Sequence, residues 1–315
     1  MITFTPTILK KLIPDVRVVT LIEYPNGVEV GRLPLSTRAV RKVVAHWVGS
    51  QGVDYGYGTI LRDSDCIIVL SDTFRDILSK CYARAEEKCV LIPPPPLMHV
   101  SMEANGDSRR RGRDALRVTP DEFLIAYYGY LYPNKGIETL LEGLHLVTQE
   151  RANVRLVIVG GDNDVLLTRM NRPRYMQELQ QLSERLGIAH KVVWTGDCPS
   201  DSEQASLYLR GADTCVLPFD DGVKLHRSSV AAAAAHGLPI ITTKGEILEF
   251  PFIDQKNVLL CPPKDPKLLA VAIDSLISNA ELRERLHSGS LQLSHEWFSW
   301  DKTLQRTIEA FKIVA

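Results

Sequence analysis

One loop and the short helix that follows it carry the residues of this sequence best suited to bind an anion. A strand is expected at Thr214–Leu217, a loop at residues 219–227 and a helix at Ser228–Ala235. The first amides of such a helix are unpaired and carry the positive end of its dipole, so they attract phosphate groups. His226 and Arg227 directly precede the helix, and a guanidinium fork matches phosphate oxygens. The segment is either a diphosphate site or an ordinary connection between a strand and a helix.

Both ends of this helix are marked in the sequence. Ser228 or Ser229 can cap its first turn, and Gly237 suits the position just after its last turn. Gly222, in the preceding loop, lets the backbone approach a ligand closely. We therefore expect the helix to begin where the loop ends, with its first amides facing any bound ligand.

A second loop of similar design covers residues 129–136, between an expected strand at Phe123–Tyr128 and a helix that starts at Ile137. Ligands of an open parallel sheet bind beyond the carboxyl ends of its strands, so the two loops would form one site if their strands are close. Lys135 would lie beside that site. A cation near a helix start is unfavourable, which favours a bound anion, although Lys135 can also be a solvated side chain.

The elements that must position these loops alternate between short apolar strands and amphipathic helices. This alternation is typical of parallel sheets covered by helices, so the predicted fold class is α/β. Strands are expected at residues 16–22, 66–71, 89–92, 123–128, 155–159, 191–194, 214–217, 240–243 and 258–260. Helices are expected at residues 37–47, 73–81, 137–147, 175–186, 203–210, 228–235, 266–278, 280–288 and 300–311.

Composition limits the possible partners. The chain has 315 residues, of which 45% are hydrophobic, enough for two globular domains. Lys plus Arg number 37 against 38 Asp plus Glu, so the net charge of -1 indicates no nucleic-acid partner. No apolar run approaches the roughly 20 residues of a membrane span. The six cysteines form no Cys-x-x-Cys pair and residues 1–10 lack a signal layout, so we expect reduced thiols in a cytoplasmic protein.

The sequence predicts a boundary between two domains. Four prolines at residues 93–96 form a stiff exit from the last strand of the first domain, which covers residues 1–100. Residues 101–120 lack periodicity and are expected to be a linker. Arginines at 109–111 and 113 within this linker could touch an anionic membrane or simply be solvated. The second domain is expected to cover residues 121–295, followed by a terminal segment at 296–315.

From about Asp121 onward the chain resembles the nucleotide-binding half of glycosyltransferase family 4. The order and spacing of several segments carry the resemblance: GYLYPNKGIETL at 129–140, LVIVGG at 156–161, VWTG at 193–196, ADTCVLPF at 212–219 and AAHGLPII at 234–241. The resemblance implies a GT-B-like fold of two Rossmann-like domains, with segment 296–315 returning to the first. It also implies retaining transfer from a nucleotide sugar to a glycan or lipid-linked acceptor, without a metal or another cofactor.

The family's functional residues match this sequence only in part. Lys135 matches the lysine that the family uses on the donor diphosphate, whereas Tyr130 replaces the arginine usually paired with it. Arg227 could supply the lost charge, so Lys135 and Arg227 are the implied catalytic residues. Ala232 stands where the family has a glutamate for the donor ribose, and Asp221 lies near the position of the family's other glutamate. The expected donor-binding residues are Gly129, Tyr130, Gly136, Asp221, Gly222, Val223, His226, Ser228 and Ser229.

In the family, further strands and a Gly-rich loop precede the strand matched by residues 16–22. The resemblance therefore implies an incomplete N-terminal domain, whose open sheet edge could pair with a protein partner or a second copy. Ile22 occupies the position of a histidine near the family's cleft, and Glu23 could take a polar role there or face solvent.

Three functions remain open at this point. The first is a hexosyltransferase-type glycosyltransferase of polysaccharide biosynthesis, cytoplasmic or peripheral at the inner membrane face. The second is a non-catalytic relative that serves as a partner or binding subunit. The third is a sugar-nucleotide epimerase, for which the cleft loops show no carboxylate pair.

Overall fold

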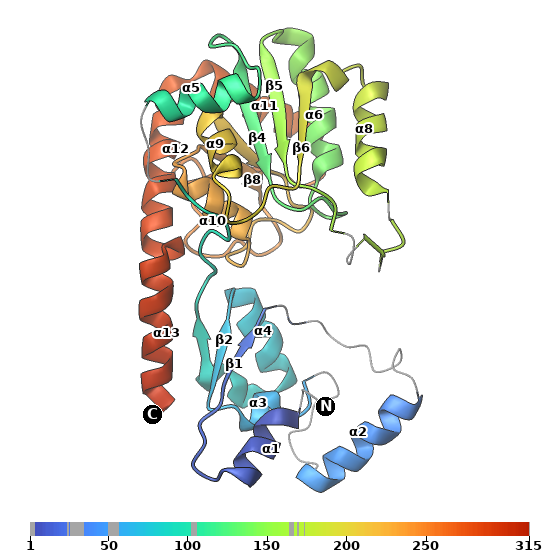
Figure 1. The fold of residues 1–315 in the computed structure, drawn as a ribbon, viewed down its shortest axis with the longest axis vertical. Coiled ribbons are helices and arrows are strands. Elements are labelled where there is room, and N and C mark those ends of the chain that lie inside the picture. The colour runs from blue at the N-terminus through green and yellow to red at the C-terminus, as the bar shows by residue number, and fades with distance from the viewer. Residues whose placement is uncertain are drawn as a thin grey trace. The chain divides into compact units, whose positions relative to one another are not determined.

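The computed structural model describes residues 4–23, 25, 35–49, 57–101, 106–163, 167–168, 170–172 and 174–314. The chain folds into two compact units, each built around its own parallel sheet (Figure 1). The first unit comprises Met1–Pro93 with Asp301–Ala315, and the second comprises Pro94–Trp300. The α/β class expected from the alternating strands and helices is confirmed.

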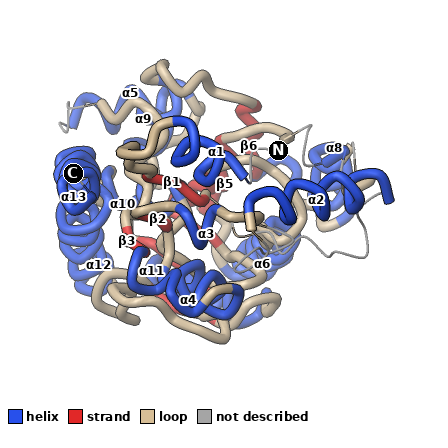
Figure 2. Tube along the Cα trace, turned by 90° about the horizontal axis from the view of Figure 1, so that it is seen from below, coloured by secondary structure: helices blue, strands red, loops and turns tan. Residues whose placement is uncertain are grey.

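The first unit has a sheet of three parallel strands, β1 (Val19–Ile22), β2 (Cys66–Val69) and β3 (Cys89–Leu91), side by side in that order (Figure 2). The central strand β2 is buried along its whole length, as its unbroken apolar run requires. Its helices are α1 (Thr5–Leu12), α2 (Leu35–Val48), α3 (Ile60–Asp63), α4 (Asp72–Cys81) and the 3₁₀ turn Ala83–Lys88.

The two faces of this sheet are covered by different parts of the chain. On one face, Ile67 and Val69 pack against Phe74 and Leu78 of α4. On the other, Cys66 and Ile68 belong to a core cluster with Ala310 of α13 (Trp300–Val314). The last helix of the chain therefore completes the core of the first unit.

The second unit has a six-stranded parallel sheet in the order β6-β5-β4-β7-β8-β9. The direction of strand addition reverses between β4 and β7, which pair through Ile125 with Thr214 and Ala126 with Cys215. Such a reversal is where open α/β sheets place their ligands. The strands are β4 (Phe123–Tyr128), β5 (Val154–Val159), β6 (Val192–Gly196), β7 (Thr214–Leu217), β8 (Ile240–Thr243) and β9 (Leu259–Cys261).

Helices follow these strands in the βα order that the sequence predicts. The bounds of β4, β7, β8, α10 and α11 agree with their predicted ranges residue for residue. The helices are α5 (Gly106–Ala115), α6 (Ile137–Glu150), α8 (Tyr175–Arg185), α9 (Gln204–Gly211), α10 (Ser228–Ala235), α11 (Pro266–Ser278) and α12 (Ala280–Leu293), with the 3₁₀ turn Ala189–Lys191 and the π-helical turn Ser294–Phe298.

The region expected to be a linker contains helix α5, which packs closely on α9. Arg113 is buried, donates to Gly211 O at 3.1 Å and to Thr119 O at 2.7 Å, and pairs with Asp213 at 3.2 Å. Arg109 pairs with the same carboxylate at 2.6 Å. The expectation of a solvated linker arginine is therefore wrong for Arg113, whereas Arg109 is exposed and paired. It failed because α5 packs through a buried charge and a glycine, not through an apolar stripe.

Two structural observations concern the predictions made from composition, on membrane spans and on cysteines. No helix in the described ranges is long and apolar enough to span a membrane. All six cysteines are free thiols, and Cys66, Cys215 and Cys261 are buried. These three act as small apolar residues of the cores.

Replacing Gly112 tests the packing of α5. A glycine-to-alanine change inside a solvated helix stabilises it by roughly 1 kcal/mol. At this site a Cβ would lie 2.2 Å from Leu207 O, so we expect Gly112→Ala to lower the free energy of unfolding by about 1–3 kcal/mol. Urea denaturation measures the sign. Asp114→Ala, on the exposed side of α5, is the control and should change stability by less than about 0.5 kcal/mol.

Candidate functional site

The two loops singled out in the sequence meet at the reversal point of the second sheet. Adjacent parallel strands end at the same edge, so the loops after β4 and β7 leave side by side. Asp220 N donates to Asn134 O at 3.1 Å, which joins the loops directly. At Gly136, where φ is +69°, a Cβ would lie 1.8 Å from Pro218 O. The expected convergence of the loops is confirmed, and Gly136 is the residue that permits it.

The first loop also touches the start of α10. Gly129 has φ +133°, and a Cβ on it would lie 3.6 Å from the Cβ of Ser229. Tyr130 is exposed, while its carbonyl accepts a hydrogen bond from the buried Tyr127 hydroxyl at 3.3 Å. The backbone at residues 129–130 therefore lies next to the helix start, and the Tyr130 ring faces solvent.

Lys135 and Arg227 come from different loops and lie against the same aromatic ring. The Nζ atom of Lys135 is 5.2 Å from the centroid of the Phe219 ring, and Cζ of Arg227 is 4.5 Å from it. Both side chains are largely buried, Lys135 with 8% of its surface exposed and Arg227 with 10%. The ring face attracts both cations. The structure thus brings Lys135 together with Arg227, the residue suggested to supply the charge lost at Tyr130.

Burial and like charge set the protonation of this cluster. Burial, together with the nearby charge of Arg227, lowers the pKa of Lys135 to about 7, against the opposing effect of Asp221. Burial also lowers the pKa of His226 to about 2, again with Arg227 among the causes. His226 is therefore neutral, and an arriving anion would meet cations whose charge is poorly compensated.

Asp221 is the main counter-ion within the cluster. Its Oδ1 accepts from Nη2 of Arg227 at 2.5 Å, and its Oδ2 lies 3.9 Å from Nζ of Lys224. The sequence predicts Asp221 as a donor ligand; in the structure its carboxylate is engaged by two cations. The neighbouring Asp220 pairs instead with Lys264 at 3.6 Å. Lys135, Lys224 and Arg227 together face little negative charge.

The start of α10 differs from the predicted cap but keeps its free amides. Arg227, with φ -81° and ψ 93°, is the cap residue, and no side chain caps the helix. The expectation of a Ser228 or Ser229 cap is wrong because both serines already lie in the first turn. Among the described residues neither serine amide has an acceptor, whereas Val230 N donates to Arg227 O at 2.9 Å. The other end is as expected, with Gly237 following the helix at φ +65°.

A third segment, between β8 and β9, supports the loop that carries the cations. A Cβ on Gly222, where φ is +84°, would lie 2.2 Å from Gly245 N, so only glycine allows this contact. Val223 N donates to Thr243 O at 2.9 Å, and Leu225 N donates to Glu249 Oε2 at 2.7 Å. The loop backbone is therefore fixed on both sides of Lys224.

Several of these residues were missed from the sequence. Lys224 lies between Gly222 and Arg227, so its place in the same loop was a usable signal. Phe219 directly follows the strand-end proline, but its role as a platform depends on two partners from different loops. Glu249, which is 3% exposed, is 24 residues from Leu225 and gave no local signal.

The arrangement suits a doubly charged anion such as a diphosphate. It offers ammonium and guanidinium groups together with two free amides, all fixed before a ligand arrives. Ala232, at the position of the family's ribose glutamate, is fully buried in α10 and offers no polar group. In the described part of the chain, no three His, Cys, Asp or Glu side chains lie close enough to hold a metal ion.

Comparison with known proteins points to one family. Residues 108–291 match the family model described as "Glycosyl transferases group 1". An uncharacterized glycosyltransferase of Methanocaldococcus jannaschii is 27% identical over 254 residues, which cover 78% of this chain and 60% of that protein. A D-inositol 3-phosphate glycosyltransferase of Jonesia denitrificans is 25% identical over 252 residues, covering 79% and 57%. The chain thus spans about 60% of the length of these curated relatives.

The fold is shared with solved structures. The structure of Anabaena HepE in complex with UDP aligns with a TM-score of 0.72 at 18% identity, covering 98% of this chain and 76% of that one. The fold of this chain is accordingly GT-B-like.

The pKa of Lys135 predicts how anion binding depends on pH. Sulfate keeps its charge between pH 6 and 9, so any change of its affinity with pH comes from titration of the protein. In the free protein Lys135 loses its proton above about pH 7 and must regain it to bind the anion. We expect sulfate affinity to fall by roughly tenfold per pH unit above 7, measured by calorimetric titration.

Two variants test whether Lys135 is the group whose titration causes this pH dependence. Lys135→Met should weaken sulfate binding and flatten its pH dependence. Arg227→Met should weaken binding too, but shift the decline to higher pH, because Arg227 lowers the pKa of Lys135. A pH dependence that survives in Lys135→Met would show that another group titrates.

Proposed function

Because the chain belongs to the group 1 glycosyl transferases, we propose that it transfers a sugar from a nucleoside diphosphate sugar to an acceptor, with retention of anomeric configuration. The observation that carries this proposal is the pair of buried cations at Phe219, next to the free amides of α10. A donor diphosphate is the part of such a substrate that needs this set of groups.

The proposed chemistry is mainly electrostatic. The bond between the sugar C1 and the β-phosphate oxygen breaks, and its electron pair leaves on the nucleoside diphosphate. Lys135, Arg227 and the amides of Ser228 and Ser229 stabilise that growing charge. The acceptor hydroxyl forms the new bond to C1 on the same face, and its proton passes to the departing phosphate oxygen. Preorganised donors of this kind lower a barrier by about 3–4 kcal/mol each.

The low pKa of Lys135 fits this role. With a pKa of about 7, Lys135 of the free protein is only partly charged near neutral pH, because burial and Arg227 disfavour its charge. A diphosphate between the two cations reverses that balance and draws a proton onto the lysine. The lysine is then charged in the complex, where the leaving group requires it.

The choice of donor and acceptor to test rests only on analogy with similar proteins. The Anabaena HepE structure contains UDP, so a UDP-hexose is the first donor to test. We propose a glycan or lipid-linked acceptor, in keeping with the family resemblance. The absence of a carboxylate at Ala232 means that the donor ribose must find its partners elsewhere.

A panel of nucleotide sugars tests the proposal. We expect turnover or hydrolysis of at least one donor by the wild-type chain. Lys135→Met and Arg227→Met should each lower kcat/KM about 10²–10³-fold, because each removes a group that stabilises the leaving diphosphate. Lys267→Met, which makes the same change at an exposed position in α11, is the matched control and should leave kcat/KM unaltered.

Thermal unfolding gives an independent readout of the donor site. A nucleoside diphosphate should raise the Tm of the wild-type chain and leave that of Lys135→Met nearly unchanged. If the nucleotide binds but no donor is consumed, the chain is a non-catalytic relative that serves as a binding subunit. If no nucleoside diphosphate shifts the Tm, the transferase proposal is wrong.

A further inference from the structure

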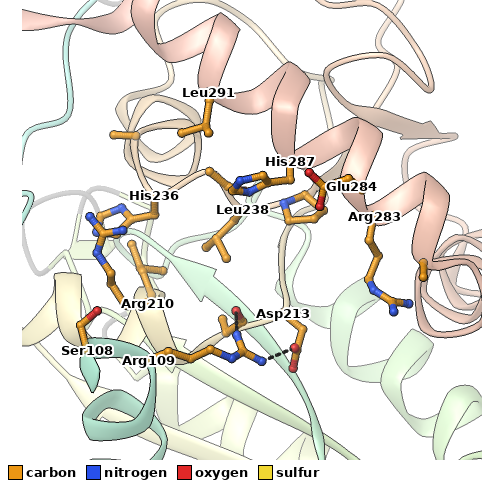
Figure 3. A pocket seen from close by; sticks show the side chains of 16 residues that line it. Ser108, Arg109, Arg210, Asp213, His236, Leu238, Arg283, Glu284, His287 and Leu291 are labelled. Atoms are coloured by element: carbon orange, nitrogen blue, oxygen red, sulfur yellow. Dashed lines mark hydrogen bonds and ion pairs between the residues drawn. The ribbon is translucent and has the colours of Figure 1, made fainter. Parts of the chain in front are cut away.

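A pocket lies at the C-terminal end of α10, away from the loops described above. It has a volume of about 720 Å³ and lies within the second unit (Figure 3). Its walls come from α5, α9, α12 and the turn between α10 and β8. An eight-residue helix separates it from the free amides of Ser228 and Ser229, a length of about 12 Å. The pocket is therefore a different place from the proposed donor site.

Positive charge is in excess on one wall of this pocket. Asp213 is shared by Arg109 at 2.6 Å and Arg113 at 3.2 Å, so one carboxylate serves two guanidinium groups. Arg210, on the same wall, has no carboxylate partner among the described residues. Figure 3 shows Arg109 joined to Asp213, with Arg210 beside His236. The other acid of the lining, Glu284, is exposed on α12.

Arg210 is the least satisfied of these cations. Its Nη2 donates to Ser101 O at 2.7 Å, while its Nε is buried and has no acceptor among the described residues. Burial lowers the pKa of Arg210, the direction expected of a cation without a counter-ion. A half-buried guanidinium in this state is stabilised by an anion that reaches it from the pocket.

His287 of α12 lies on another wall of the pocket and is held in a fixed orientation. Nδ1 of His287 lies 2.6 Å from the carbonyl oxygen of Gly237, which can only accept, so Nδ1 carries the proton. In this tautomer Nε2 carries a lone pair and can only accept, so it suits a hydroxyl group of a ligand. A Cβ on Gly237 would lie 2.7 Å from His287 Cε1, so the glycine that ends α10 also makes room for this ring.

Arg283 and His236 are engaged elsewhere. Nη1 of Arg283 donates to Ile277 O at 3.0 Å and so closes the end of α11. His236 donates from Nδ1 to Ala232 O at 2.7 Å and accepts from Ser206 Oγ at 2.7 Å, which satisfies both nitrogens of the neutral ring. His236 is therefore not free to bind a ligand, and Nη1 of Arg283 is already used within α11.

We propose that this pocket binds a small phosphate-bearing molecule, with the charges of Arg210 and Arg109 attracting the phosphate and Nε2 of His287 accepting from a hydroxyl group of the organic part. Arginine suits this role because its five N–H donors allow it to hold a phosphate while keeping other partners. Leu238 and Leu291, which also line the pocket, offer apolar contact to the organic part. The assignment does not depend on the proposed transferase activity.

Calorimetric titration tests the pocket after the donor site has been removed. In the full-length Lys135→Met/Arg227→Met variant we expect inorganic phosphate to bind, and glycerol 3-phosphate to bind more tightly. Adding Arg210→Gln should raise both Kd values about tenfold or more, because a hydrogen bond to a charged group is lost. Arg285→Gln, on α12 but outside the lining, is the matched control and should leave both Kd values unaltered.

Two results would overturn the proposal. One is the absence of phosphate binding in the donor-site variant. The other is binding that Arg210→Gln leaves unchanged. Should Arg210→Gln fail to fold, Arg109→Gln decides between the outcomes, because the Arg109 side chain is 45% exposed and lies at the edge of the wall. It should weaken phosphate binding by a similar factor if the proposal holds.

Discussion

The second unit holds two cations, Lys135 and Arg227, against one ring in a largely buried position. Like charges so placed repel each other, and burial removes the water that would screen them. Other features of the site follow from this constraint: the pKa of Lys135 falls to about 7, His226 is neutral, and Asp221 is drawn to Arg227. A bound dianion would relieve the strain on all of them, which is why a diphosphate is the ligand that best explains the arrangement.

Sheet topology and two glycines make this constraint possible. The strand order brings β4 beside β7, so the lysine loop and the arginine loop end at one edge. Gly136 permits contact with Pro218, and Gly222 permits contact with Gly245. A Cβ at Gly136 would lie 1.8 Å from Pro218 O and one at Gly222 would lie 2.2 Å from Gly245 N, so a side chain at either position would force the loops to move. The free amides of α10 depend on the same geometry, since the loop that ends at Arg227 sets where the helix begins.

Much of the second unit could be predicted because its signals are local. Apolar runs bounded by turn residues marked β4 and β7, and Gly237 marked the end of α10. The pairing of Lys135 with Arg227 needed the family resemblance in addition, because nothing local connects residues 92 positions apart. Helix α5 was missed because a buried arginine and a glycine have no apolar period. Glu249 and the platform role of Phe219 were missed because each depends on a contact formed only by folding.

The most direct test of the central claim is a crystal structure of the chain with UDP. The account predicts that the diphosphate lies between Lys135 and Arg227, with its oxygens within about 3.2 Å of Lys135 Nζ and of the Ser228 or Ser229 amide. It also predicts that Arg227 turns at least one donor from Asp221 to the phosphate. A diphosphate bound elsewhere on the second unit, with the start of α10 left empty, would contradict the account.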